Sequence, residues 1–152
     1  MTSKKQMKSA SRFFAVQALF QMEASDQSFE DVREQFITHR FGAVMEGDTY
    51  AEGNVDLFDA ILTQAVNQQA KIDQMTDRAL VAKWPIDRID PTVRAIFRAA
   101  GAEFVIGETP PKVTITEYVD VAKAFFPDGN ESRFVNAVLD HMARESHPDK
   151  FK

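Results

Sequence analysis

The side chains best suited to catalysis or metal binding are few in this sequence. It contains no cysteine, which excludes disulfides, cysteine nucleophiles, thiolate metal sites and iron–sulfur clusters. Its three histidines are His39, His141 and His147, and the last two are six positions apart, a spacing that does not place them on one helical face. We therefore predict that the chain holds no metal ion.

Catalytic motifs are equally scarce. The sequence has no glycine-rich phosphate loop and no serine-elbow motif. Carboxylates are plentiful, but no recognisable set of partners marks two of them as an acid/base pair. We predict no catalytic residue, no cofactor and no enzymatic activity.

The charges are distributed unevenly along the chain. Lys4, Lys5, Lys8 and Arg12 precede the first acidic residue, Glu23, whereas the rest of the chain has 14 basic and 23 acidic residues, or 14 − 23 = −9. A protein that binds nucleic acids without sequence specificity would instead have positive charge spread over a whole face. Composition fits two interpretations of the basic start: a solvated terminus, or a local arm that contacts phosphates.

Length and composition are those of one soluble globular domain. The chain has 152 residues, of which 44% are hydrophobic, including 13 phenylalanines. This is enough apolar material for a core without metal or disulfide support. No apolar run exceeds five residues, so we predict neither a membrane-spanning helix nor a signal peptide, and a cytoplasmic location.

Apolar residues recur at helical spacing in the first half of the chain. The spacing predicts a helix from about Ser9 to Ala24 and a second one capped by Ser28. Residues 41–53 contain three glycines and no period, which predicts a connecting loop. Asn54 is expected to cap a third helix, and apolar residues spaced over 72–79 indicate a fourth.

Prolines delimit the helices of the second half. Trp84-Pro85 is expected to end the fourth helix, and Asp90-Pro91 and Thr109-Pro110 to begin the next two as cap-plus-proline pairs. The β-like stretch 113–116 lies inside a longer helical period, and a turn at 127–130 precedes the last helix. We predict an all-α fold of seven helices without a sheet. The positions expected in its core include Phe58, Ile61, Ile96, Phe97, Val119 and Leu139.

Four segments together resemble a known family. They are AVQALFQ (15–21), WPIDRIDPTVRAIFRAAGAEF (84–104), PPKVTITEYVDVAKAF (110–125) and RFVNAVLD (133–140). In this order and at these distances they resemble the NusB family of bacterial transcription antitermination factors, over residues 12 to 145. The resemblance implies a fold of two perpendicular three-helix subdomains. Along the chain we expect a basic arm (1–11), a NusB-like domain (12–148) and a tail (149–152).

The resemblance also implies a function without catalysis. Members of the family bind the boxA segment of single-stranded leader RNA as a heterodimer with the ribosomal protein NusE. The complex joins RNA polymerase in antiterminated transcription, particularly of ribosomal RNA operons. No membrane is involved, and both monomer and homodimer are open for the free protein.

Family motifs that contact RNA can be matched to positions of this chain. The resemblance implies RNA contacts by Lys4, Lys5, Lys8, Arg12, Gln17, Phe20, Asn130, Arg133 and Phe134. Bases of single strands stack on aromatic side chains, which suits Phe20 and Phe134. Both residues also fit core positions of their helices, and Asn136, in the same motif, equally fits a buried cap or a helix-pairing amide.

A second surface is expected to bind the protein partner. By resemblance it surrounds Trp84 to Arg98, where Asp87, Arg88 and Arg94 are charged residues near a capped helix start, and Trp84 is expected to anchor the core.

Two other functions fit the sequence. One is a stand-alone relative of the NusB-like domain of ribosomal RNA methyltransferases, and the other is a helical interaction or dimerisation module that does not bind RNA.

The sequence departs from the family pattern at a few positions. Phe20 stands where a tyrosine is frequent, which removes a hydroxyl group, and the arm is rich in lysine, which cannot form arginine's bidentate fork with phosphate. Gly101-Ala102 occupies a helical position where larger apolar residues are common, and Ala137 replaces a usual glycine. These departures bear on RNA affinity more than on the fold.

Overall fold

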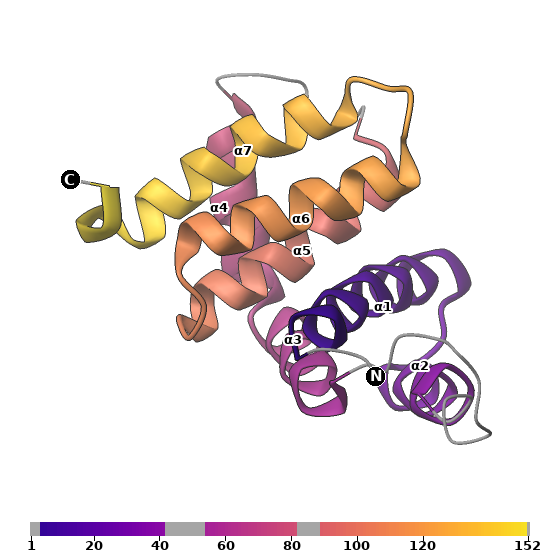
Figure 1. The fold of residues 1–152 in the computed structure, drawn as a ribbon. Helices are drawn as coiled ribbons and strands as arrows, with labels where there is room; N and C mark the ends of the chain where they lie inside the picture. The colour runs from indigo at the N-terminus through magenta and orange to yellow at the C-terminus, as the bar shows by residue number, and fades with distance from the viewer. Residues whose placement is uncertain (1–3, 42–53, 82–88, 152) are drawn as a thin grey trace.

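The computed structural model describes residues 4–41, 54–81 and 89–151, and these form seven α-helices and no strand (Figure 1). The predicted all-α fold is confirmed over this part of the chain. The α-helices are α1 (Lys4–Ser25), α2 (Phe29–Phe36), α3 (Val55–Asn67), α4 (Gln69–Val81), α5 (Pro91–Ile106), α6 (Pro111–Phe125) and α7 (Glu131–Ser146). A π-helical turn, η1 (Ile37–Phe41), continues α2, and a 3₁₀ turn, η4 (Pro148–Phe151), follows α7.

The helices form two groups that meet along α5. In Figure 1, α1, α2 and α3 lie together below, and α4, α5, α6 and α7 lie together above. Helix α5 contacts α1 and α3 of the first group as well as α4, α6 and α7 of its own. Helix α6 also contacts α1, so α1 is bordered by both α5 and α6.

Three of the predicted helix caps are present. The side chains of Ser28, Asn54 and Asp90 accept hydrogen bonds from backbone N–H groups at the starts of α2, α3 and α5, at 3.1, 2.9 and 2.7 Å. Each bond satisfies a donor that the helix itself leaves unpaired. Pro91 follows Asp90 at the first helical position, as predicted.

The predicted cap at Thr109 is wrong. The N-cap of α6 is Pro110, and Pro111 takes the first helical position. The Thr109 hydroxyl instead donates to Oε1 of Glu103 at 3.2 Å. The second proline therefore shifts the helix start by one residue and frees the threonine for a tertiary contact.

Helix α1 begins at Lys4, earlier than the predicted Ser9, so the described part of the basic arm is helical. Ser11 ties these first turns to the start of α3, because its hydroxyl donates to the carbonyl oxygen of Asn54 at 2.7 Å and accepts from the Asn54 N–H at 2.6 Å. The predicted loop 41–53 falls mostly outside the described residues, although Phe41 belongs to η1. Trp84-Pro85 also lies outside them, and α4 ends at Val81.

The core runs through both groups of helices. Phe58, Ile61, Ile96 and Leu139 are fully buried, and Phe97 nearly so, as predicted. Val119 is only half-buried and packs at the edge of the core. Over the described residues, no helix combines the length and apolar character needed to cross a membrane.

Candidate nucleic-acid interface

One side of α1 carries polar and aromatic residues that the core does not cover. Ser9, Phe13, Gln17 and Phe20 recur at three- and four-residue spacing, which places them along one side of the helix. The side that faces the core holds the buried residues Ala15, Val16, Ala18 and Leu19. Helix α1 thus divides into a core-facing side and an accessible side.

Phe20 is an exposed aromatic residue on this accessible side. Its exposed fraction is 38%, which excludes a core position for it. It borders a hollow of about 380 Å³ between α1 and neighbouring helices. The lining residues are Gln17, Phe20, Gln21, Ala24, Ser25, Phe36, Thr92 and Phe125. An exposed aromatic ring beside an amide side chain is a suitable contact for a nucleic-acid base.

The lysines of α1 line a groove at the opposite end of the helix. Lys4, Lys5 and Lys8 are exposed, and the groove, of about 760 Å³, lies between the starts of α1 and α6. Lys112 from α6 joins them, together with the carboxylates of Glu108, Glu117 and Asp120. Sequence reasoning missed Lys112, although it lies within the family-like segment PPKV. The groove is therefore lined by several lysines, but carboxylates lie among them.

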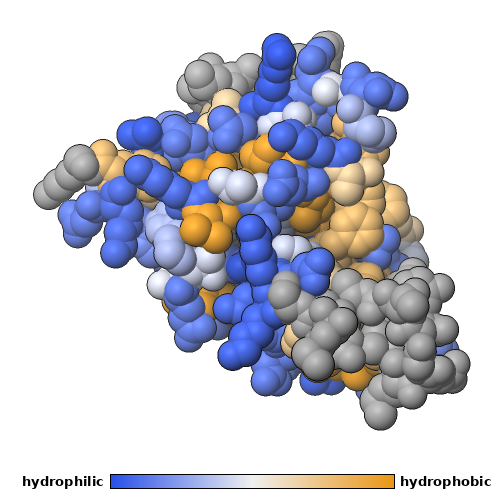
Figure 2. Space-filling view, in the orientation of Figure 1, coloured by the Kyte–Doolittle hydropathy of each residue, from blue (hydrophilic) through white to orange (hydrophobic). Residues whose placement is uncertain are grey.

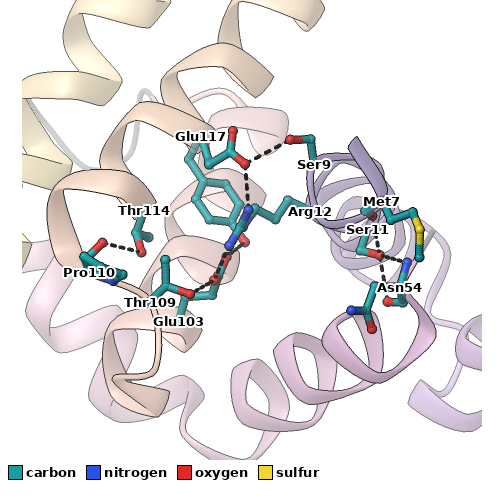
Figure 3. A network of polar contacts seen from close by, with 11 residues as sticks. Met7, Ser9, Ser11, Arg12, Asn54, Glu103, Thr109, Pro110, Thr114 and Glu117 are labelled. Atoms are coloured by element: carbon teal, nitrogen blue, oxygen red, sulfur yellow. Dashed lines mark hydrogen bonds and ion pairs between the residues drawn. The ribbon is translucent and has the colours of Figure 1, made fainter. Parts of the chain in front are cut away.

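Arg12 is placed differently from the three lysines. Its side chain is 4% exposed and extends from α1 between Glu103 of α5 and Glu117 of α6 (Figure 3). Its Nε and Nη2 donate to the two carboxylate oxygens of Glu103 at 2.7 and 3.1 Å, and its Nη1 donates to Glu117 Oε1 at 2.7 Å. This guanidinium is engaged with protein carboxylates, so its geometry is that of a link between helices.

The network around Arg12 extends to two further side chains. The Tyr118 hydroxyl donates to Glu103 Oε2 at 2.7 Å, and the Ser9 hydroxyl donates to Glu117 Oε1 at 2.9 Å. Burial raises the pKa of Tyr118 well above its usual value of 10, and the neighbouring charge of Glu103 adds to this effect. Tyr118 therefore remains a hydrogen-bond donor over the physiological pH range.

The start of α7 supplies the remaining predicted RNA contacts. Asn130, Arg133 and Asn136 are exposed, which excludes a buried role for Asn136. Phe134 is half-buried, and its ring packs edge-on against Phe97, with centroids 5.8 Å apart and an interplanar angle of 64°. Phe134 is thus anchored in the core and presents only part of its ring to the surface.

The predicted partner surface is described only in part. Asp87, Arg88 and Trp84 lie outside the described residues. Arg94 forms an ion pair with Glu23, to which Arg98 also donates at 3.0 Å. The hydrogen bond from Arg94 is the main reason that the pKa of Glu23 lies below its ordinary value.

Within the described ranges, no three histidine, aspartate or glutamate side chains are grouped so that they could hold a metal ion.

Comparisons with known proteins agree on one family. The NusB family model matches residues 9–144. The transcription antitermination protein NusB of Maricaulis maris (strain MCS10) is 41% identical over 95% of this chain and 91% of its own length. The same protein of Granulibacter bethesdensis is 41% identical over 99% of this chain and 96% of its own length.

Solved structures have the same fold. NusB of T. maritima superposes with a TM-score of 0.76 at 26% identity, covering 99% of both chains. A chain from a crystal structure of the antitermination factors NusB and NusE with double-stranded RNA superposes with a TM-score of 0.74 at 18% identity. It covers 94% of this chain and 99% of that one.

Proposed function

Because the chain belongs to the NusB family, we propose that it is a transcription antitermination factor that binds boxA RNA together with the ribosomal protein NusE. The complex would act on RNA polymerase during transcription of ribosomal RNA operons, in the cytoplasm and without catalysis. The observation that carries this proposal is that α1 bears exposed lysines near its start and the exposed ring of Phe20 near its end.

The proposed RNA surface combines charge with stacking. Lys4, Lys5 and Lys8 contact phosphates, and Phe20 stacks on a base beside Gln17. At the start of α7, the surface continues through Asn130, Arg133 and the accessible edge of Phe134. Arg12 serves this surface indirectly, since its buried ion pairs fix α1 against α5 and α6.

The proposed NusE surface includes Arg94 and its ion pair with Glu23. Both side chains are about one-third exposed, at 33% and 30%, so the pair is accessible to a partner. Asp87 and Arg88 belong to the same proposed surface. Arg94→Glu is expected to weaken NusE binding while leaving the binding of RNA to the free protein unchanged, because Arg94 is not on the proposed RNA surface.

The few lysines on α1 make RNA binding by the free protein weak. Three exposed lysines neutralise few phosphates, and the body of the protein is acidic, so a surface shared with NusE is needed for tight binding. We expect the affinity for a labelled boxA RNA, measured by fluorescence anisotropy at several salt concentrations, to rise strongly when NusE is added.

Two control RNAs complete this experiment. A scrambled strand of equal length tests sequence preference, and a duplex tests strandedness, because a similar solved complex contains double-stranded RNA. Equal affinity for boxA RNA with and without NusE would contradict the cooperative mode. Absence of binding to every RNA would instead favour a helical protein-interaction module, whose dimerisation can be measured by sedimentation.

A further inference from the structure

We propose that Phe13 and Phe125 form a second base-stacking platform, placed between the lysine-lined groove and Phe20. This inference rests on the proposed RNA-binding function and extends its site to two residues that the sequence did not single out. It starts from an aromatic pair that bridges α1 and α6. The two rings are nearly parallel, with centroids 4.9 Å apart and an interplanar angle of 7°.

Both rings of this pair reach the surface. Phe13 and Phe125 are half-buried and pack on the core from outside. Hydrophobic side chains gather over the C-terminal end of α6 beside α1, on the right of the molecule in Figure 2. A ring fixed on one side by its stacked neighbour and by the core is held rigidly, and its accessible part can receive a base without ordering a loose side chain.

The pair is continuous with the proposed RNA surface. Phe13 shares the accessible side of α1 with Gln17 and Phe20, and lies about 10 Å from Phe20 along the helix axis. Phe125 lines the same hollow as Gln17 and Phe20. In the other direction, Phe13 lies about 12 Å along the axis from Lys5. The platform thus lies between the phosphate-contacting lysines and the exposed ring of Phe20.

The charges along this path allow a nucleic acid to follow it. Glu117 faces α1 between the lysines and Phe13, and its carboxylate is paired with Arg12 and bonded by Ser9. Its repulsion of phosphate is therefore reduced. On the exposed side of α6, Asp120 is followed one turn later by Lys123, so opposite charges alternate there.

One exposed lysine (Lys5), one ring of the stacked pair (Phe13) and an amide side chain (Gln17) on the same side of α1 favour RNA over a protein partner. Base–aromatic stacking combined with phosphate contacts is the general mode of single-strand recognition. A protein segment docking here would need acidic side chains to meet the neighbouring lysines. Protein docking is accordingly the competing outcome of the test.

Leucine substitutions separate stacking from packing. Phe13→Leu and Phe125→Leu keep an apolar side chain on the core but remove the aromatic face. Phe14→Leu is the matched control, because Phe14 is also half-buried on α1 and meets the rings of Phe13 and Phe41 only edge-on, with centroids 6.4 and 5.3 Å away. Its substitution leaves the stacked faces of Phe13 and Phe125 in place. Each variant is assayed with NusE and a boxA RNA that carries 2-aminopurine at successive positions, and thermal melts report the fold.

We expect Phe13→Leu and Phe125→Leu each to weaken RNA binding roughly 5- to 150-fold, the range that base–aromatic stacking supports. The salt dependence should not change, because stacking releases no counterions. Fluorescence quenching at one RNA position should be lost, and the double variant should lose less than the product of the single losses, because the two rings act as a unit. Phe14→Leu should bind as the original protein does.

Three results would overturn the platform. The first is unchanged affinity and quenching in Phe13→Leu while Phe20→Ala weakens binding, which would leave the proposed function standing. The second is an equal loss in Phe14→Leu, which would indicate a packing effect. The third is weaker NusE binding with unchanged RNA binding, which would assign the pair to a protein partner. The proposed function itself fails only if the original protein binds no RNA in the presence of NusE.

Discussion

Arg12 of α1 and Glu103 of α5 form a bidentate ion pair inside the protein, with exposed fractions of only 3% and 2%. Two buried charges are stabilising only when each has well-placed partners. Glu117 supplies the guanidinium with a third carboxylate contact, and Tyr118 and Thr109 supply Glu103 with two hydroxyl donors. The pair therefore holds α1 in a fixed position against the second group of helices.

Breaking this pair is expected to destabilise the protein strongly. Arg12→Met leaves the Glu103 charge buried without its cation, which typically costs about 3–5 kcal/mol of unfolding free energy. Urea unfolding followed by circular dichroism measures the loss. The control is Arg33→Met, which breaks the exposed ion pair with Asp59 and should cost less than about 1 kcal/mol. Similar losses in the two variants would show that the buried network does not stabilise the fold.

The same network shows what sequence analysis could predict. The partners of Arg12 lie 91 and 105 residues away along the chain, so its position in the sequence suggested a solvated or phosphate-contacting cation. Ser28 and Asn54, in contrast, cap helices through bonds to residues three positions away, and the sequence predicts such contacts well. Local partners are visible in the sequence, whereas a buried ion pair exists only after the helices have assembled.

Phe20 and Phe134 illustrate the same limit for the candidate site. Both residues have core-compatible helical spacing, and the sequence does not distinguish them. In the fold, Phe20 is 38% exposed at the rim of a hollow, while the ring of Phe134 packs against Phe97. The Phe13–Phe125 pair likewise joins two helices and has no signature within either one.

Gly101 gives a second test of stability. It allows α5 to approach α4 closely, because a Cβ atom at this position would lie 2.4 Å from Cγ2 of Ile72. Gly101→Ala should therefore lose about 1–3 kcal/mol by overpacking, offset by up to about 1 kcal/mol of improved helix propensity. Ile72→Leu removes the clashing methyl group and should recover part of the loss in the double variant. A Gly101→Ala protein more stable than the original would contradict the close approach.

The ion pair of Glu23 with Arg94 predicts a pH dependence. The hydrogen bond from Arg94 lowers the pKa of Glu23 below its ordinary 4.5. A carboxyl group whose pKa is lower in the folded state stabilises the fold above its unfolded pKa, and this stabilisation is lost as the pH falls through the folded value. The original protein should therefore have a higher unfolding free energy than Glu23→Gln. This difference should be largest at about pH 6 and should shrink as the pH falls towards about 3. Asp128→Asn, which changes an exposed turn carboxylate, is the control, and an advantage that does not vary with pH would refute the assignment.

The lysines of α1 should determine the salt dependence of RNA binding. Each phosphate neutralised on a single strand contributes about 0.7 to the slope of log affinity against log salt, so changing Lys4, Lys5 and Lys8 to Gln should reduce the slope by up to about 2. The loss should be similar for boxA and scrambled RNA, because phosphate contacts carry no sequence information. Lys71→Gln, which removes an exposed charge from α4, should leave the slope unchanged. An unchanged slope in the triple variant would place the phosphate contacts elsewhere.

Phe20 and Phe134 are expected to respond differently to the same substitution. Phe20→Ala should change the unfolding free energy by less than about 0.5 kcal/mol, because the ring is exposed, but should weaken RNA binding by about 1–3 kcal/mol. Phe134→Ala should destabilise the fold by about 2 kcal/mol or more, because it removes the edge-on packing against Phe97. Thermal melts and RNA titrations on both variants separate these effects, and salt titrations should give the original slope for each. If Phe20→Ala binds RNA as tightly as the original protein, Phe20 does not stack on a base. If Phe134→Ala loses RNA affinity at a temperature where it is fully folded, its accessible edge contacts RNA directly.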